Sequence, residues 1–217
     1  MQEMNNREWQ IYAALFELLA LSFRYPDLTL VDALVSGEYA EAAVEIAEAL
    51  GLGFTDEVES ILASYRGVDP DALRSTLRVE ATRLFVGAPE PVISPYEGVW
   101  RAIDDGVQPL LFVNPHSMAV ERFYRSCGVG QPEGKNEPLD HISTELEFLQ
   151  YLCMLEAEMV EPNPNIELPE DGWASVLNRF LEEHALVWMP RFADATYEQS
   201  RVPFYQAAAQ LLKASIA

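Results

Sequence analysis

Apolar side chains recur along most of this chain at the spacing of an α-helix. Near its beginning they follow one another at steps of three and four residues, from Trp9 through Phe16 to Phe23, and so share one helical face. Similar patterns occupy residues 28–37, 38–51, 55–65 and 69–87. The period-two alternation that marks a half-buried strand is not sustained anywhere. The pattern therefore predicts an all-α fold.

Residues that favour helix ends stand at the borders of these patterns. Thr55 is expected as an N-cap, and so is Asp69, which precedes a proline suited to the first helical position. Gly51 is expected to end its helix. In the same way, Asn114 and Pro115 are expected to begin another helix.

Two stretches interrupt the helical pattern. Residues 87–115 contain five prolines and three glycines, and we expect them to form a loop with ordered aromatic residues. Residues 128–138, GVGQPEGKNEP, are polar and rich in glycine and proline, a composition that suits an interdomain hinge. The chain is thus expected to form two helical lobes, 1–127 and 142–217, joined by a hinge at 128–141.

The second half begins with NEPLDHISTELEFLQYL, residues 136–152, which opens a long apolar pattern. Glu137 precedes proline and is expected as an N-cap, with Pro138 at N1 and Asp140 at N3 of a helix that reaches about Val160. Further helices are predicted in 173–188, 189–200 and 203–216. The buried stripe of the long helix is expected to consist of Ile142, Leu146, Leu149 and Cys153.

The charge balance restricts the kinds of partner. The chain has 35 acidic and 14 basic side chains, which gives a net charge of −21. Such a surface repels phosphate backbones and anionic lipid headgroups, so we expect no nucleic-acid partner and no stable membrane insertion. The same field would attract a basic peptide and speed its encounter.

The cysteines and the first residues bear on the compartment. Cys127 and Cys153 lack CxxC spacing, which indicates neither a disulfide framework nor a zinc site. MQEMNNREWQ lacks a basic segment followed by an apolar core, and no run reaches 18 apolar residues. We therefore expect no signal peptide, no transmembrane span and a cytoplasmic location.

Asp140 and His141 are the first candidates for chemistry, because a carboxylate beside an imidazole can fix its tautomer or hold its charge. Neither His141 nor His184 lies in the Glu-x-x-His motif of di-iron helical bundles, and the nearest match to a metal pair is His141 with Glu145. GxSxG, Walker A and GxGxxG motifs are absent. The sequence therefore carries no enzyme signature, although a helical carboxylate/His metalloenzyme stays open as an alternative.

Aromatic residues on the proline-rich stretch are the second candidates. Tyr96 and Trp100 lie four residues apart, shortly after Leu84 and Phe85. Core packing is the commoner role of a single aromatic side chain. As a set on an irregular segment, these residues suggest a groove for a peptide.

Four motifs together resemble one protein family. EPLDH (137–141) resembles the E-P-x-D-H hinge signature of the TorD/DmsD family of redox-enzyme maturation chaperones. RLFVG (83–87) resembles the family's aromatic-x-x-L-F region, and SPYEGVW (94–100) resembles its P-Y/W-x-S-V-Y/W segment. FLEEHALVWMPRF (180–192) and then VPFYQAAAQLL (202–212) resemble its C-terminal H-x3-W and P-F-Y pattern. The chain departs from the family at Ala81, in place of an aromatic residue, and at Gly98, in place of serine.

The resemblance implies an all-α, non-enzymatic, cytoplasmic chaperone. Its partners would be the twin-arginine signal peptide and the apo form of a molybdopterin-dependent catalytic subunit, whose cofactor insertion it assists before export. It would need no cofactor, although weak guanine-nucleotide binding is also implied, and it would be a monomer or a dimer swapped through the hinge. An interaction protein with another kind of client stays open. The expected signal-peptide-binding residues are Leu84, Phe85, Tyr96, Trp100, Glu137, Pro138, Asp140 and His141.

Overall fold

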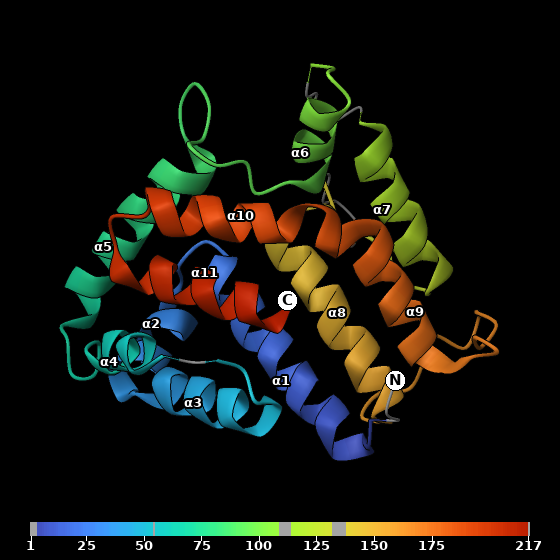
Figure 1. Cartoon of the computed structure of the whole chain (residues 1–217), viewed down its shortest axis with the longest axis horizontal. Coiled ribbons are helices and arrows are strands. Elements are labelled where there is room, and N and C mark those ends of the chain that lie inside the picture. Colours follow the sequence, from blue (N-terminus) through green and yellow to red (C-terminus); the bar gives the residue numbers. More distant parts are fainter. Residues whose placement is uncertain (1–3, 54, 109–113, 132–137, 217) are drawn as a thin grey trace. The chain divides into compact units, whose positions relative to one another are not determined.

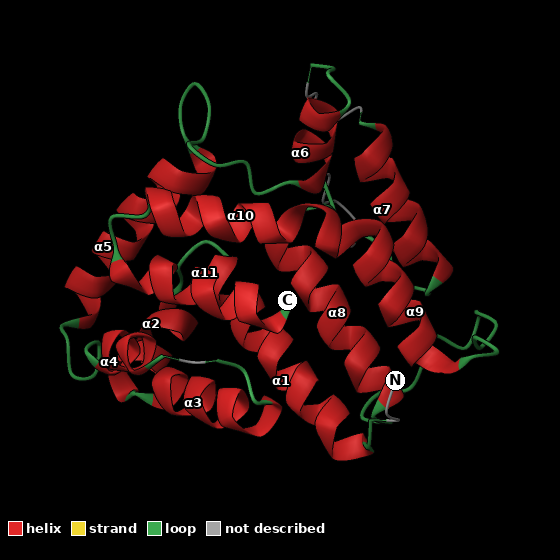
Figure 2. Ribbon diagram, in the orientation of Figure 1, coloured by secondary structure: helices red, strands yellow, loops and turns green. Residues whose placement is uncertain are grey.

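Helices joined by loops make up this computed structural model, which describes residues 4–53, 55–108, 114–131 and 138–216. Those residues contain no strand, and the predicted all-α fold is confirmed (Figure 2). Two short π-helical segments, η1 (Thr82–Val86) and η2 (Leu181–Ala185), continue α5 and α9. The helices of Figure 1 are α1 (Asn6–Phe23), α2 (Leu28–Ser36), α3 (Glu38–Leu50), α4 (Asp56–Ala63), α5 (Pro70–Ala81), α6 (Glu97–Asp104), α7 (Pro115–Ser126), α8 (Ile142–Glu156), α9 (Gly172–Phe180), α10 (Leu186–Gln199) and α11 (Pro203–Ser215).

The chain divides into two compact units. Unit 1 comprises Met1–Glu17 and Pro95–Trp188, and unit 2 comprises Leu18–Ser94 and Met189–Ala217. The divisions fall inside α1, inside α10 and just before α6. They differ from the borders of the predicted lobes, because both helices that flank the expected hinge, α7 and α8, belong to unit 1. Residues 132–137 lie outside the described part of the chain, so a hinge at residues 128–141 stays a prediction.

Aromatic rings fill the centre of unit 1. The ring of Phe148 on α8 lies 4.2 Å from that of Tyr124 on α7 and 4.9 Å from that of Phe180 on α9. Helix α8 packs along α9, and α6 packs on α7 (Figure 1). The predicted stripe of α8 is confirmed, since Ile142, Leu146, Leu149 and Cys153 are all buried.

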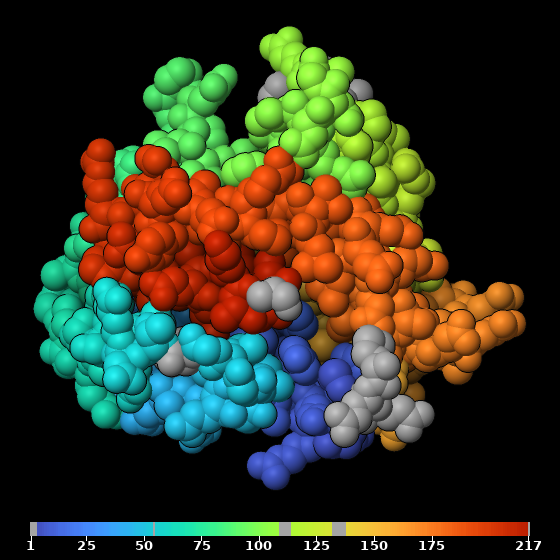
Figure 3. Space-filling view, in the orientation of Figure 1, coloured from blue at the N-terminus to red at the C-terminus, as the bar shows by residue number. Residues whose placement is uncertain are grey.

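Unit 2 packs its helices around a second core. Helix α2 contacts α3 and α5, and α4 contacts both α3 and α11. In Figure 3 the atoms of α4, in cyan, lie against those of α11, in red. Tyr39 is buried against Phe204 at a ring distance of 5.6 Å, and its hydroxyl lies 2.6 Å from that of Ser22.

Local signals at helix ends are confirmed where the cap and its partner are close in sequence. The side chains of Thr55, Asp69 and Asn114 accept hydrogen bonds from backbone N–H groups at the starts of α4, α5 and α7. Gly51 ends α3 with a φ of 64°, in the left-handed conformation that glycine adopts without steric cost.

Three predictions about helices are wrong. The stretch 87–115 is not all loop, because α6 forms within it. Pro190 does not begin a separate helix but lies inside α10. Helix α8 begins at Ile142 with His141 as its N-cap, rather than at Pro138, and it ends at Glu156. None of the described helices combines the length and the apolar character needed to cross a bilayer.

Candidate functional site

Two short extended segments of unit 1 meet just before α6 and α8. Tyr96 and His141 form an isolated antiparallel bridge, in which Glu97 N donates to Asp140 O at 3.0 Å and Ile142 N donates to Pro95 O at 2.8 Å. Tyr96 is also the N-cap of α6, as His141 is of α8. The bridge therefore places the first turns of two helices side by side.

The Asp140 side chain is buried and connects α6 with α7. Its Oδ2 accepts from the backbone N of Gly98 in α6 at 2.8 Å and from Oγ of Ser117 in α7 at 2.6 Å. Asp140 thus caps the first turn of α6, although it lies next to the start of α8. This position corrects the expectation that Asp140 occupies N3 of its own helix, because α8 begins at Ile142 with His141 as its N-cap.

Gly98 is required by the close approach of α7 to α6. A Cβ atom at this position would lie 2.4 Å from Oγ of Ser117 and 2.9 Å from Cγ of Asn114. Asn114 Nδ2 donates to Gly98 O at 2.6 Å, while its Oδ1 caps α7. The departure from the family serine at this position therefore has a steric reason in this chain.

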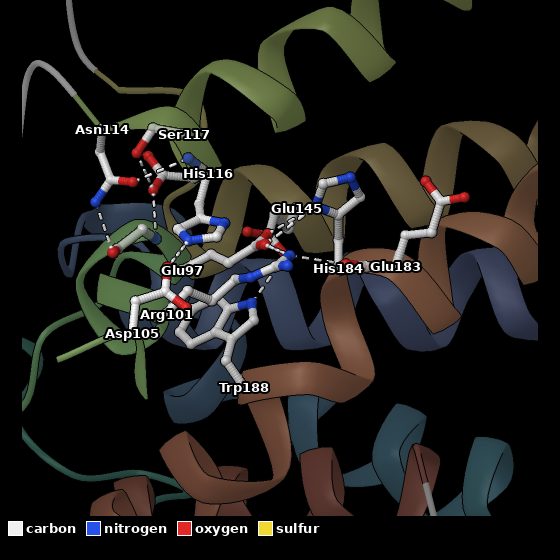
Figure 4. A network of polar contacts seen from close by, with 12 residues as sticks. Glu97, Arg101, Asp105, Asn114, His116, Ser117, Glu145, Glu183, His184 and Trp188 are labelled. Carbon is white, nitrogen blue, oxygen red and sulfur yellow. Dashed lines mark hydrogen bonds and ion pairs between the residues drawn. The ribbon is translucent and has the colours of Figure 1, made fainter. Parts of the chain in front are cut away.

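Glu97 is the centre of a buried polar network (Figure 4). Its carboxylate accepts from Nη1 of Arg101 at 2.8 Å, and its two oxygens lie 3.0 and 3.1 Å from Nδ1 of His184. Nη1 of Arg101 also donates to Glu183 O at 2.9 Å. The network joins α6 to η2, so the π-helical turn of η2 is held at His184 and Glu183. Such turns are frequent at functional sites.

Glu145 on α8 is the second buried glutamate in this region, with no exposed surface. Its Oε2 accepts from Nε1 of Trp188 at 3.1 Å, and no described residue gives its Oε1 a hydrogen-bond partner. Burial, together with the charges of Glu97 and Asp140, raises the pKa of Glu145 well above its usual value. Glu145 therefore favours its neutral, protonated form.

The pKa values of Asp140 and Tyr124 are also raised in this part of unit 1. Burial raises the pKa of Asp140, against the hydrogen bonds from Ser117 and Gly98, which lower it. Burial and the charges of Glu145, Glu97 and Asp140 raise the pKa of the Tyr124 hydroxyl. Asp140 Oδ1 and the Tyr124 hydroxyl are buried without a hydrogen-bond partner in the described part of the chain. This interior is therefore acidic and incompletely paired.

His141 is a neutral cap with an aromatic neighbour. Its Nδ1 accepts from the backbone N of Ser143 at 3.2 Å, and burial lowers its pKa to about 4. Its ring meets that of Tyr96 edge to face, with 5.2 Å between centroids. Desolvation therefore favours the neutral form of the imidazole near neutral pH.

The part of this site that another molecule can touch is mostly apolar. Tyr96, Trp100, Pro138 and His141 are half-buried, and Ile103, one turn beyond Trp100, is 61% exposed. Beneath them lie Asp140 and Glu97, with no exposed surface. The buried charges can hold the backbone in place, and the rings can bind an apolar segment.

The remaining predicted residues lie elsewhere. Leu84 and Phe85 belong to η1 in unit 2, where Leu84 has no exposed surface. Phe85 is half-buried, and its ring lies 5.7 Å from those of Phe192 and Tyr205. Glu137 falls outside the described residues. The structure thus brings together the unit 1 members of the predicted set, and the binding role of the set stays a prediction.

Sequence reasoning did not place Glu97, Glu145, His184 and Trp188 in the site. Two of them carried a signal, because the H-x3-W spacing puts His184 and Trp188 about one helical turn apart. The alternative of His141 with Glu145 as a metal pair gains no support: across the described ranges, no three His, Cys, Asp or Glu side chains are arranged to share a cation.

The chain is similar in sequence to a known protein family and to several known proteins. The family model described as nitrate reductase delta subunit matches residues 33–194. The selenate reductase assembly chaperone of Thauera selenatis is 29% identical over 177 residues, which is 78% of this chain and 86% of that protein. The chaperone TorD of Photobacterium profundum is 26% identical over 76% of this chain and 74% of its own length. The Tat proofreading chaperone DmsD of Salmonella typhi is 27% identical over 62% of this chain and 56% of its own length.

A solved structure supports the fold independently. A protein described as a redox enzyme maturation protein from Archaeoglobus fulgidus superposes with a TM-score of 0.52 over 93% of this chain and 91% of that one, at 24% identity. Fold and relatives together define the class of all-helical assembly chaperones of redox enzymes. Within that class, the chain belongs to the nitrate reductase delta subunit family, the family of TorD and DmsD.

Proposed function

We propose that this chain is a cytoplasmic, non-enzymatic chaperone that binds the twin-arginine signal peptide of a molybdopterin-dependent oxidoreductase subunit. It holds the apo subunit until the cofactor has been inserted. The relatives named above are assembly chaperones of reductases, which supports a client of this kind. The observation that carries the proposal is the half-exposed face of Tyr96, Trp100, Pro138 and His141, held by fully buried carboxylates.

The two parts of a twin-arginine signal are recognised by different physical terms. Its apolar core contacts the rings of Tyr96 and Trp100, where removal of apolar surface from water is favourable. Its arginine pair is drawn to the protein by the net charge of −21, a long-range effect that salt screens beyond about 8 Å. Salt should therefore slow association more than it shortens the lifetime of the complex.

Asp140 acts in this proposal as a positioning residue. Its carboxylate has no exposed surface and already accepts from Gly98 and Ser117. A client arginine cannot reach it while these bonds persist, so its effect on binding passes through the first turn of α6, which carries Trp100.

The test is calorimetric titration of a synthetic twin-arginine signal peptide into the full chain. Trp100→Ala should weaken binding by about 1 to 3 kcal/mol, the usual effect of truncating an aromatic anchor. Tyr197→Ala is the matched control, because it removes an aromatic side chain that is 44% exposed in unit 2. Equal affinity of the parent and Trp100→Ala would contradict the proposed face, and so would an equal loss in Tyr197→Ala.

A signal peptide in which both arginines are replaced by glutamine measures how much charge contributes to the rate of association. Its association in a stopped-flow experiment should be slower than that of the parent peptide at low salt and should approach it as salt rises. If the two peptides associate equally fast at low salt, charge does not guide the encounter.

A further inference from the structure

Helix α5 in unit 2 carries two arginines without an acidic partner. Arg74 and Arg78 lie one turn apart, and neither forms an ion pair or a hydrogen bond with any residue that the structure describes. Acidic side chains outnumber basic ones by 35 to 14 in this chain, and other arginines of the unit are paired, such as Arg83 with Glu80 and Arg66 with Glu41. Arg74 and Arg78 differ from Arg83 and Arg66 in having no acidic partner, and they lie one helical turn apart.

Both arginines line one pocket of about 500 Å³, a volume within the range of small-molecule sites. Three hydroxyl groups line the same pocket, from Tyr25, Ser75 and Thr82. Its single carboxylate is that of Asp71, so two guanidinium charges and one carboxylate leave a net charge of +1. All of the lining residues belong to unit 2, and they are Tyr25, Asp71, Arg74, Ser75, Arg78, Val79 and Thr82.

The Arg78 side chain is held before any ligand arrives. The guanidinium carbon of Arg78 lies 4.9 Å from the centre of the Tyr25 ring, and the Tyr25 hydroxyl lies 3.2 Å from Oγ1 of Thr82. The Nε atoms of Arg74 and Arg78 are buried. Because the guanidinium of Arg78 stacks on the Tyr25 ring, less side-chain entropy is lost when its remaining N–H donors bind a ligand.

The chemistry of this donor set favours a tetrahedral oxyanion. Guanidinium groups match phosphate oxygens with pairs of parallel hydrogen bonds, and hydroxyl groups add further donors. Like charges four residues apart on a helix repel each other, and an anion between them removes that repulsion. The negative field of the whole chain opposes the approach of any anion, so the attraction has to come from the two guanidinium groups.

We propose that this pocket binds the phosphate or diphosphate group of a small soluble ligand. The pocket shares no residue with the proposed peptide-binding face of unit 1, and the inference does not depend on the proposed function. It assigns to α5 a second binding capacity of the chaperone, directed to an anion where the first is directed to a basic peptide.

The experiment is calorimetric titration of the full chain with pyrophosphate and with inorganic phosphate at constant ionic strength. The parent should show saturable binding. Arg74→Gln and Arg78→Gln should each weaken pyrophosphate binding at least tenfold, and the double variant should abolish it. Arg66→Gln, which removes an exposed and ion-paired arginine of the same unit, is the matched control and should bind like the parent. Circular dichroism should show that all variants keep their helix content.

Several outcomes would overturn the proposal. These are no saturable binding by the parent at millimolar pyrophosphate, or an equal loss in Arg66→Gln. Succinate that binds as tightly as pyrophosphate would show a carboxylate site in place of a phosphate site. Retention on phosphatidylcholine vesicles containing phosphatidic acid, without binding of pyrophosphate, would show a lipid headgroup in place of a soluble ligand.

Discussion

Each of the two units buries carboxylates, and the two environments shift their pKa values in opposite directions. In unit 2, Glu80 is 4% exposed, and Arg83 binds it with two hydrogen bonds of 2.9 and 2.8 Å. The hydrogen bond from Arg83 lowers the pKa of Glu80. In unit 1, Asp140 and Glu145 have no exposed surface, and burial raises the pKa of both.

Burial alone therefore does not decide the charge of a carboxyl group in this protein. Glu80 has a guanidinium beside it and a third hydrogen bond, from the backbone N of Arg201 at 2.6 Å. In unit 1, the guanidinium of Arg101 binds Glu97, and Glu145 has no cation beside it but accepts from the indole of Trp188 and lies near Glu97. A cation thus keeps one buried acid ionised, while an acid near other acids gains a proton. The two units should respond differently to mutation and to pH.

The largest effect is expected at Glu97. Glu97→Ala leaves Arg101 and His184 without their carboxylate in a buried site, which should cost about 3 to 5 kcal/mol of unfolding free energy. Urea unfolding followed by circular dichroism measures this loss. The control is Glu121→Ala, which breaks a more exposed pair with Arg125 and should cost less than about 1 kcal/mol. Equal losses in the two variants would show that the Glu97 network contributes no more than a surface pair.

Gly98→Ala should have the next largest effect. The added methyl group collides with Ser117 and Asn114, so Ser117 must leave Asp140, at a cost of about 1 to 3 kcal/mol. Gly130→Ala is the matched control in the same unit, because a Cβ there meets nothing within 4 Å. In a Ser117→Ala background, Gly98→Ala should cost less. Full additivity of the two changes would contradict a steric origin.

The dependence on pH should distinguish the two kinds of buried acid. Because the pKa of Glu145 is raised in the folded state, its contribution to stability is complete below about pH 4 and is lost as pH rises through the folded value. Glu145→Gln cannot ionise, so its stability relative to the parent should increase between pH 5 and pH 8.

Glu80 should behave in the reverse way. Its pKa is lowered, so its contribution is present above about pH 4 and is lost as pH falls through the folded value. The parent should lose stability relative to Glu80→Gln only on acidification below pH 4. Denaturant unfolding of both variants at each pH provides the measurement, and the same sign of slope in both would refute the comparison.

The smallest effect is expected at the cap of α8. His141→Ala removes a side chain that caps the helix, which should cost about 1 kcal/mol. His141→Asn keeps a capping oxygen but removes the ring, so it should keep most of the stability of the parent. If the His141 ring contacts the signal peptide, both variants should bind it less tightly. Parental affinity in His141→Asn would limit the residue to its role as a cap.

Helix ends whose capping partners are close in sequence could be predicted from residue types. The candidate site contains a cap of the same chemical kind that could not be predicted. Thr55, Asp69 and Asn114 cap helices through partners two or three residues away, and each was predictable from its residue type. Asp140 has the same chemistry, but its backbone partner, Gly98, is 42 residues away. Sequence alone could not show which helix this aspartate caps.

The acidic interior of unit 1 could not be predicted from the sequence for a related reason. Glu97 and His184 are 87 residues apart, and polar side chains in an amphipathic pattern are ordinarily expected to face solvent. The motifs identified the segments that meet, since SPYEGVW, EPLDH and the H-x3-W pattern all contribute to the network. Periodicity within each segment could not show that their charged residues face inward.

The bridge between Tyr96 and His141 also bears on the stage of folding at which the proposed binding face forms. Closing a long chain segment has an entropic cost, which two backbone hydrogen bonds can hardly offset alone. The bridge must then wait for α6, α7 and α8 to pack, and its amides should be protected from hydrogen exchange only after those of the helices. A nascent chain that has not passed Trp188 lacks the indole that binds Glu145. The proposed peptide-binding face is therefore expected to form late, after synthesis of the chain has reached α10.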